Sequence, residues 1–440
     1  MKRVALLLVI LALASAGFIS CSSASKSPAP GTSGLNTRVF ASQSVATPNS
    51  SPGLIIINGQ DDTLPRAAEI PAGVSPGLMA ISSDRKTVLA LDSITNSVQI
   101  VNAKTESSLG SVPMPGPTTS TVTSMVALAA GAGLIAVPAA PVNGFPPGAV
   151  VMINLVTGGT LFTISVPDVQ TVVANSTETT VLALNGSGSI TIISPLLVNT
   201  GLPFVTTVSG FDSAVYAVFS SDGNTAYVLN CGLECGGTQA SVQTLNLTTS
   251  PPTPGVPIPV NGATVALLQG SMLYVAGNGT PEGPLCTSIP SAAATAAQHC
   301  GFLDIVNLTT MQDPSFNNPA AEIAVTDGYH DRIDMSVNGQ LFVGSYGCTT
   351  VGDVNNPEGE VRGCLAIYNS ATGEVIIPPD NGDVTGLQNF STRDVEYVAE
   401  GGRLRVYDTQ IDSLLLTDFV TTGTIIFGGQ VVDVKAVDFF

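Results

Sequence analysis

The chain of 440 residues has no tryptophan, two histidines and few charged residues, which make up 10% of it. Without tryptophan, a carbohydrate-stacking platform would have to be built from tyrosine or phenylalanine. Lys and Arg number 14 against 32 Asp and Glu, so the formal net charge is −18. Such a field repels nucleic acid and anionic lipid headgroups. No Walker, Rossmann, H-E-x-x-H or C-x-x-C-H motif is present, and we expect neither a nucleic-acid partner nor a cofactor.

The N-terminal segment has the pattern of an export signal. Lys2 and Arg3 precede an apolar run, Val4 to Ala16, that is too short to span a bilayer. The segment ends Phe-Ile-Ser-Cys at Cys21, which resembles a bacterial lipobox and implies that Cys21 carries the lipid. The alternative is ordinary secretion, with Cys21 in a discarded peptide. We expect a lipoprotein signal peptide over residues 1–20 and a flexible tether over residues 21–36.

The six remaining cysteines fall into three close pairs. These are Cys231 with Cys235, Cys286 with Cys300, and Cys348 with Cys364. Their even number and close spacing predict three local disulfides in an oxidising compartment. Free thiols or a metal cluster are the alternative, although a cluster would need further Cys or His ligands.

A phrase of two short apolar strands separated by turn signals recurs about every 45 residues, as from Ser82 to Thr105. This period is typical of a β-propeller with one blade per copy, and we number the strands of a blade from the channel outward. The second strand has eight copies, namely Arg38–Ser44, Thr87–Ser93, Gly133–Ala139, Thr180–Gly186, Thr225–Cys231, Met272–Asn278, Leu341–Gly347 and Val395–Gly401. We therefore predict an all-β, eight-bladed propeller of four-stranded antiparallel blades over residues 37–440, with seven blades as the alternative.

The two ends of the repeat array predict how the ring closes. The N-terminal copy begins at a second strand, with Arg38, and the chain finishes with an unpartnered strand, Gln430–Phe439. We expect this last strand to be the first strand of the first blade. Both chain ends would then share one sheet, which removes two free edges.

One repeat unit carries a family resemblance. From Ser220 to Thr249 it reads SSDG, then the apolar strand YVLN, then SVQTLN followed by Leu-Thr-Thr. This resembles the YVTN-type propeller repeat, although no copy reads YVTN, and the likeness extends over nearly the whole mature chain. It implies a propeller of an extracytoplasmic or surface protein. Relatives by fold include lactonases and propeller subunits of quinoprotein dehydrogenases, so the resemblance implies the fold more than a function.

The three cysteine pairs fall in loops that follow the second strands of the fifth, sixth and seventh copies. In a propeller these loops lie on one face, together with the turns that lead into each first strand. We expect a built binding surface there, because functional residues concentrate on loops carried by a rigid scaffold. The alternative is that the disulfides restrain long insertions.

The most polar turn expected on the same face runs from Thr326 to Asp334. With the next turn around the ring, it gives a predicted ligand face of Asp327, Tyr329, His330, Asp331, Arg332, Arg393 and Asp394. Such groups at a channel mouth could bind a small polar ligand or act as acid and base. His330 could equally be a surface salt-bridge partner.

The loop from Gly352 to Glu360 is a weak calcium candidate. Its oxygen ligands would be Asp353, Asn355, Glu358 and Glu360. Oxygen ligands at short spacing suit Ca²⁺, but the spacing is not that of an EF-hand, and a solvated acidic loop is the alternative.

These observations favour a monomeric protein of the bacterial cell envelope, periplasmic or on the cell surface, that contacts the membrane through its lipid anchor alone. The expected function is a non-catalytic binding or scaffold module, which meets a partner protein or an envelope polymer through its disulfide-tied face. The alternative is a lactonase-like hydrolase at the channel mouth, for which His330, Arg332 and Arg393 would serve.

Substitution of the cysteine predicted to carry the lipid tests the membrane attachment. Cys21→Ala should move the protein from the membrane fraction to the soluble fraction, because two or three acyl chains hold a protein on a bilayer and a bare tether does not. The measurement is fractionation with immunoblotting, with Cys231→Ser as the matched cysteine control. A Cys21→Ala protein that stays with the membrane would contradict the lipobox interpretation.

Overall fold

The computed structural model describes residues 32–44, 52–65, 69–117, 122–195, 204–279, 301–318, 320–348, 351–353, 356–361, 364–378, 382–414, 424–425 and 429–438. The predicted signal peptide, Cys21 and the pair Cys286–Cys300 lie outside these residues. In the described part, the 3-10 turn η3 (Gly232–Cys235) is found beside the strands and no α-helix is present. None of its helical structure is long and apolar enough to cross a membrane.

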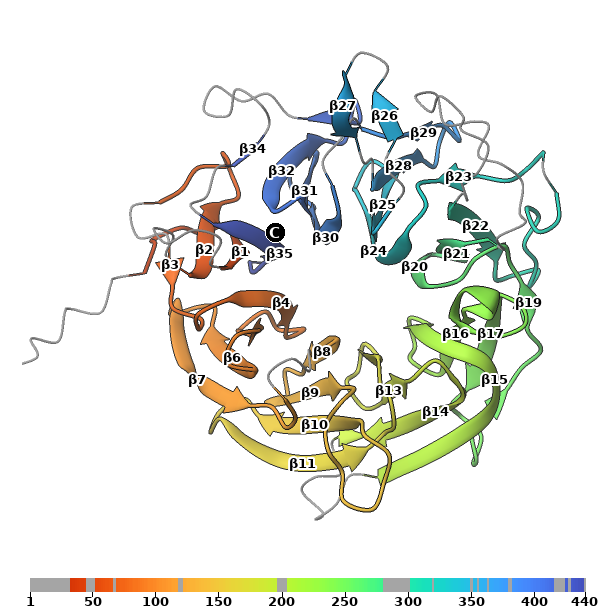
Figure 1. Ribbon diagram of the computed structural model, residues 1–440, viewed down its shortest axis with the longest axis horizontal. Coiled ribbons are helices and arrows are strands. Elements are labelled where there is room, and N and C mark those ends of the chain that lie inside the picture. The colour runs from red at the N-terminus through yellow and green to blue at the C-terminus, as the bar shows by residue number, and fades with distance from the viewer. Residues whose placement is uncertain are drawn as a thin grey trace, which may run out of the picture.

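Antiparallel sheets stand around a central opening like the blades of a propeller (Figure 1). The sheet that holds both chain ends has the order β3 (Glu69–Ile70), β2 (Gly53–Asn58), β1 (Arg38–Ser44), β35 (Gln430–Ala436). The next is β4 (Pro76–Ile81), β5 (Thr87–Asp92), β6 (Ser97–Asn102), β7 (Ser107–Pro113). It is followed by β8 (Ser124–Ala127), β9 (Ala132–Val137), β10 (Ala149–Asn154), β11 (Gly159–Ser165).

An eight-stranded sheet comes next around the ring. It contains β12 (Thr171–Ala174), β13 (Val181–Leu184), β14 (Ser187–Ser194), β15 (Phe204–Phe219), β16 (Thr225–Asn230), β17 (Ser241–Asn246), β18 (Thr253–Pro254) and β19 (Ile258–Pro259). The next sheet contains β20 (Val265–Gln269), β21 (Met272–Asn278), β22 (Gly301–Asn307) and β23 (Ala324–Val325). It is followed by β24 (Tyr329–Met335), β25 (Gln340–Tyr346), β28 (Leu365–Asn369) and β29 (Val375–Ile376). The last large sheet contains β30 (Val384–Phe390), β31 (Val395–Glu400), β32 (Arg403–Asp408), β33 (Ser413–Leu414) and β34 (Thr424–Ile425). A separate hairpin consists of β26 (Val351–Asp353) and β27 (Asn356–Val361).

The 16-residue strand β15 joins two radial groups of strands into the eight-stranded sheet. Its first part pairs with β14 and its second part with β16, so it passes from the circumference of the ring to the centre. Gly210, with φ of 111°, and Ser213, with φ of 58°, lie where the strand changes partner. Glycine adopts such positive φ values at little cost, which allows the strand to bend there.

The core lies between neighbouring sheets. Leu89 on β5 and Ile135 on β9, both with no exposed surface, belong to one apolar cluster although they come from different sheets. Strands such as β9, in which every residue is buried, are covered on both faces. The predicted second strands are all strands of the structure, and this two-sided burial explains why they are continuous apolar runs without alternation.

Strand β35 closes the ring by pairing antiparallel to β1, as the sequence predicted. Beyond the strands, the Arg38 guanidinium holds Asp438, with Nε 2.9 Å from Oδ2 and Nη2 2.6 Å from Oδ1. Asp433 reaches the neighbouring sheet, where its carboxylate accepts the Met79 backbone N–H at 2.8 Å. Closure therefore rests on backbone pairing reinforced by buried charged groups.

The folded part begins before residue 37, the predicted boundary. The Ser33 hydroxyl donates to Glu106 Oε1 at 2.6 Å, and Leu35 packs against the core cluster between the first two sheets. The end of the predicted tether is therefore bound to the propeller.

Removal of the closing strand tests its role. Deleting residues 430–440 should abolish cooperative unfolding, because burial of Val431, Val434 and Val437 contributes about 1.5–3 kcal/mol each, against about 5–15 kcal/mol for a whole domain. The measurement is urea unfolding followed by circular dichroism. A synthetic peptide of residues 430–440 should restore the transition and a scrambled peptide should not. A truncated protein that unfolds like the full chain would contradict the closure.

Candidate functional site

Two of the predicted disulfides are formed. Cys231–Cys235 spans η3 in the loop between β16 and β17, and Cys348–Cys364 encloses the hairpin β26–β27 between β25 and β28. Both loops follow the second strand of their radial group, so they open on the same face of the ring, which we call the disulfide face. The third pair, Cys286–Cys300, lies outside the described residues.

Hydrogen bonds connect the loops of the disulfide face across three neighbouring sheets. Glu234, between the first two cysteines, accepts the backbone N–H and the side-chain amide of Asn278, each at 3.1 Å. The same Asn278 amide donates to the Gly328 carbonyl at 2.7 Å. Burial raises the pKa of Glu234 to about 6. These loops therefore form one connected surface.

An aromatic pair adjoins this connection. The rings of Tyr329 and Tyr346 lie 5.4 Å apart between centroids, tilted at 43°, and Tyr346 is 46% exposed. Burial, followed by the charge of Tyr346 and Glu234, raises the pKa of Tyr329. The pair presents apolar contact area at the end of β24 and β25 that faces away from the turn joining them.

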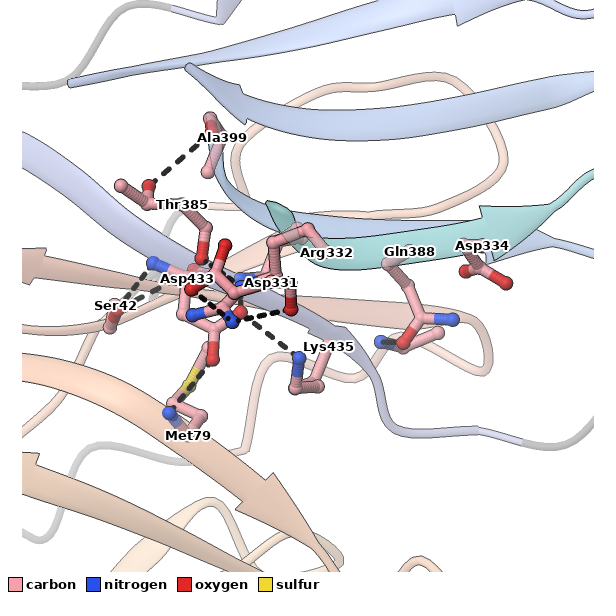
Figure 2. A network of polar contacts seen from close by, with 12 residues as sticks. Ser42, Met79, Asp331, Arg332, Asp334, Thr385, Gln388, Ala399, Asp433 and Lys435 are labelled. Atoms are coloured by element: carbon pink, nitrogen blue, oxygen red, sulfur yellow. Dashed lines mark hydrogen bonds and ion pairs between the residues drawn. The ribbon is translucent and has the colours of Figure 1, made fainter. Parts of the chain in front are cut away.

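Charged groups meet at the centre of the ring (Figure 2). The Arg332 Nε donates to the Thr385 carbonyl at 2.7 Å, and its Nη1 lies 2.9 Å from Asp331 Oδ2. On strand β35, which follows β30 around the ring, the Lys435 ammonium is 3.0 Å from Asp433 Oδ1. Burial raises the pKa of Asp331 to about 6, against the lowering effect of Arg332.

His330 is neutral and takes no part in these ion pairs. It is fully buried, and its Nε2 lies 2.8 Å from the Thr326 carbonyl, which can only accept, so Nε2 carries the proton. Burial lowers the pKa of His330 to about 4. The predicted surface salt bridge of this residue is therefore wrong: Tyr329 to Asp334 belong to strand β24, and the alternation of the strand turns His330 inward. Asp327 precedes the strand, where its carbonyl accepts the Ser345 hydroxyl at 2.7 Å.

Arg393 and Asp394 lie on the opposite face, so their placement beside His330 is wrong. They occupy the turn after the inner strand β30, not the turn before it, because β30 begins at Val384. Arg393 binds Asp62 through its two terminal nitrogens, with Nη1 2.7 Å from Oδ1 and Nη2 2.8 Å from Oδ2. Asp394 accepts the Asn338 side-chain amide at 2.9 Å. The set expected for a hydrolase, His330 with Arg332 and Arg393, is not assembled.

One short segment fits the G-x-S-x-G pattern of serine hydrolases, namely Gly73 to Gly77. That motif needs an exposed serine between a strand and a helix. Ser75 is buried, its hydroxyl lies 3.3 Å from that of Ser93, and the segment leads into strand β4. The structural context of a nucleophile is therefore missing.

The calcium candidate stays a prediction. Asp353 ends β26, while Glu358 and Glu360 lie in β27, and Asn355 is outside the described residues. Across the described ranges, no group of three or more His, Cys, Asp or Glu is arranged to hold a metal ion.

Sequence reasoning missed Glu234, Asp433 and Lys435. Asp433 and Lys435 stand two residues apart in the otherwise apolar strand β35, so the pleat turns both toward the same side. This polar alternation within a predicted inner strand was a usable signal for a charged channel wall. Glu234 had no such signal, because its partner Asn278 is distant in sequence.

No protein family model and no curated protein matches the chain. Among solved structures, it is similar to "Dihydro-heme d1 dehydrogenase NirN in complex with DHE", with a TM-score of 0.58, 11% identity, and coverage of 92% of this chain and 75% of that chain. It is also similar to the Swd1 β-propeller domain of Myceliophteria thermophila, with a TM-score of 0.48, 11% identity, and coverage of 77% of this chain and 98% of that chain. A third similar structure is Kuenenia stuttgartiensis hydrazine synthase, with a TM-score of 0.45, 12% identity, and coverage of 76% of this chain and 77% of that chain. At 11% identity, the first likeness shows the fold alone.

The buried histidine predicts a defined pH dependence. Its folded pKa lies below the ordinary 6.5, so the stability that neutral His330 contributes is complete above pH 6.5 and is lost as pH falls toward 4. The shift corresponds to about 3 kcal/mol. His330→Gln, which keeps an N–H donor, should lose less free energy of unfolding than the wild type between pH 7 and 4.5, as measured by urea unfolding.

Glu234 and Asp331 have raised pKa values, so their contribution to the free energy of unfolding increases as pH falls over the same range. Because this contribution is present in both proteins, it cancels in the difference between variant and wild type. His299→Gln, at the other histidine, is the control. Parallel pH profiles for His330→Gln and the wild type would contradict the assignment of His330 as the titrating group.

Proposed function

We propose that this protein is a non-catalytic binding or scaffold module of the bacterial cell envelope, which contacts a partner protein or an envelope polymer through its disulfide face. The observation that carries this proposal is the continuous connection of Glu234, Asn278 and Gly328 between two disulfide-closed loops. Loops held in one arrangement lose little conformational entropy when a partner binds, which favours recognition.

Several further features belong to the same proposal. The sheet order supports an eight-bladed ring if the two radial groups that share β15 count as two blades. We also propose that the repeat is of the YVTN type, that the protein is a monomer, and that Cys21 is its membrane anchor. Disulfides fit an oxidising, extracytoplasmic compartment.

The route of the chain supports the orientation of this surface. Strand β1 begins at Arg38, next to Asp438 at the end of β35, on the face opposite the disulfides. Residues 21 to 32 span at most about 40 Å when fully extended. A lipid on Cys21 would thus hold the opposite face toward the membrane and leave the disulfide face free for a partner.

Site-specific photocrosslinking in native envelopes tests the proposal. A photoreactive residue at Leu233 or Tyr346, 55% and 46% exposed on the disulfide face, should give a discrete crosslinked product. Matched controls are Val156 and Ile411, 82% and 67% exposed in turns of the opposite face. Immunoblotting and mass spectrometry detect the products. Products from the control positions alone, or from none, would contradict partner binding by the disulfide face.

A further inference from the structure

The propeller encloses a central cavity of about 630 Å³. It is lined by the strands nearest the axis of the ring, namely β4, β8, β12, β15, β20, β24 and β35. A volume of this size lies within the range of about 300–1,000 Å³ that is usual for small-molecule sites. The cavity lies inside the ring and is separate from the loops of the disulfide face.

The two sides of the cavity differ in chemistry. One side is apolar and is formed by strands β8, β12, β15 and β20, with Val126, Val173, Val218 and Leu267 among its lining residues. The other side belongs to β24 and β35 and carries Asp331, Arg332, Asp433 and Lys435. A ligand that fits both sides must have an apolar body and one polar end.

Most polar atoms on the charged side already have partners. Asp433 accepts the N–H groups of Met79 and Val434, both at 2.8 Å, and pairs with Lys435. Arg332 is held by the Thr385 carbonyl and by Asp331 Oδ2. Asp331 Oδ1, in contrast, is a buried oxygen without a hydrogen-bond partner among the described residues. A buried acceptor without a donor is costly, so this oxygen is where a ligand donor gains most.

The unpaired oxygen determines the sign of the charge that the ligand should carry. Among the charged residues that line the cavity, the carboxylates Asp331 and Asp433 are balanced by the cations Arg332 and Lys435. Among the described residues of this lining, Asp331 Oδ1 is the carboxylate oxygen left without a donor. A single positively charged donor suits it best, in a chain whose formal net charge is −18.

We propose that the central cavity binds a small monocationic molecule with an apolar body, whose ammonium group donates a hydrogen bond to Asp331 Oδ1 while its body lies against the apolar side. The half-buried Tyr216, which also lines the cavity, adds an aromatic ring near the charge. Aromatic rings attract ammonium groups through their faces. This site is independent of partner binding at the disulfide face.

The test uses three probes of one shape and different charge. Phenethylamine, 2-phenylethanol and phenylacetate are titrated into the intact protein by isothermal calorimetry at pH 7.5. The amine should bind about 10- to 100-fold more tightly than the alcohol, and the carboxylate should bind most weakly, because the interaction is a hydrogen bond to a charged group. Equal binding of amine and alcohol, or no binding of the amine, would overturn the proposal.

Two variants locate the binding to the cavity. Asp331→Asn removes the charge and should weaken amine binding about 10-fold or more, whereas Val218→Phe fills the apolar side and should weaken all probes that bind. Asp394→Asn, on the opposite face, is the matched control and should bind like the wild type. Thermal unfolding verifies that each variant is folded. Unchanged amine binding in folded Asp331→Asn would overturn the assignment, and crosslinking at Leu233 should be unaffected by both cavity variants.

Discussion

The whole structure depends on the antiparallel pairing of β1 with β35, because a ring of sheets is stable only when its last gap is closed. The backbone N–H and C=O groups of an open edge would otherwise be left to bind water or another chain, so the closing edge is more critical than any one blade. The pairing places Val39 opposite Ala436 and Ser44 opposite Gln430. Asp433 and Arg38 then fix the closed sheet to its surroundings.

Closure also determines the chemistry of the centre. Strand β35 brings Asp433 and Lys435 to the axis, where they face the Asp331–Arg332 pair of β24. These two strands come from distant parts of the sequence and meet because both are the innermost strands of their sheets. A charged wall opposite an apolar wall is therefore a product of the ring and is absent from any single blade.

The repeat period and the continuous apolar strands were sufficient to predict the propeller, the second strands and the closing strand. The local disulfides at Cys231 and Cys348 followed from spacing alone. The predicted ligand face was less successful, since it combined His330 with Arg393. An error in strand phase moves a turn to the other face of the ring. The run Pro-Pro-Asp-Asn-Gly-Asp over residues 378–383 is a strong turn signal directly before β30, and it would have fixed the start of this strand.

The sequence also did not reveal which polar side chains are buried. The residues around His330 are charged, which suggested a solvated turn, yet the side chain is enclosed and bonded to the Thr326 carbonyl. Similarly, Glu234 and Asn278 meet across neighbouring sheets, and no local pattern links them. Contacts of this kind depend on how sheets pack side by side, which the order of residues within one strand does not reveal.

Ring closure has a consequence for biogenesis. Arg38 and Asp438 are 400 residues apart, so the loop they close is almost the entire folded chain. Bringing such distant segments together costs about 5 kcal/mol of chain entropy. During synthesis, β1 leaves the ribosome long before β35. The inner edge of β1 therefore stays unpaired until β35 has been synthesised, and during that interval it offers other chains a strand edge to pair with.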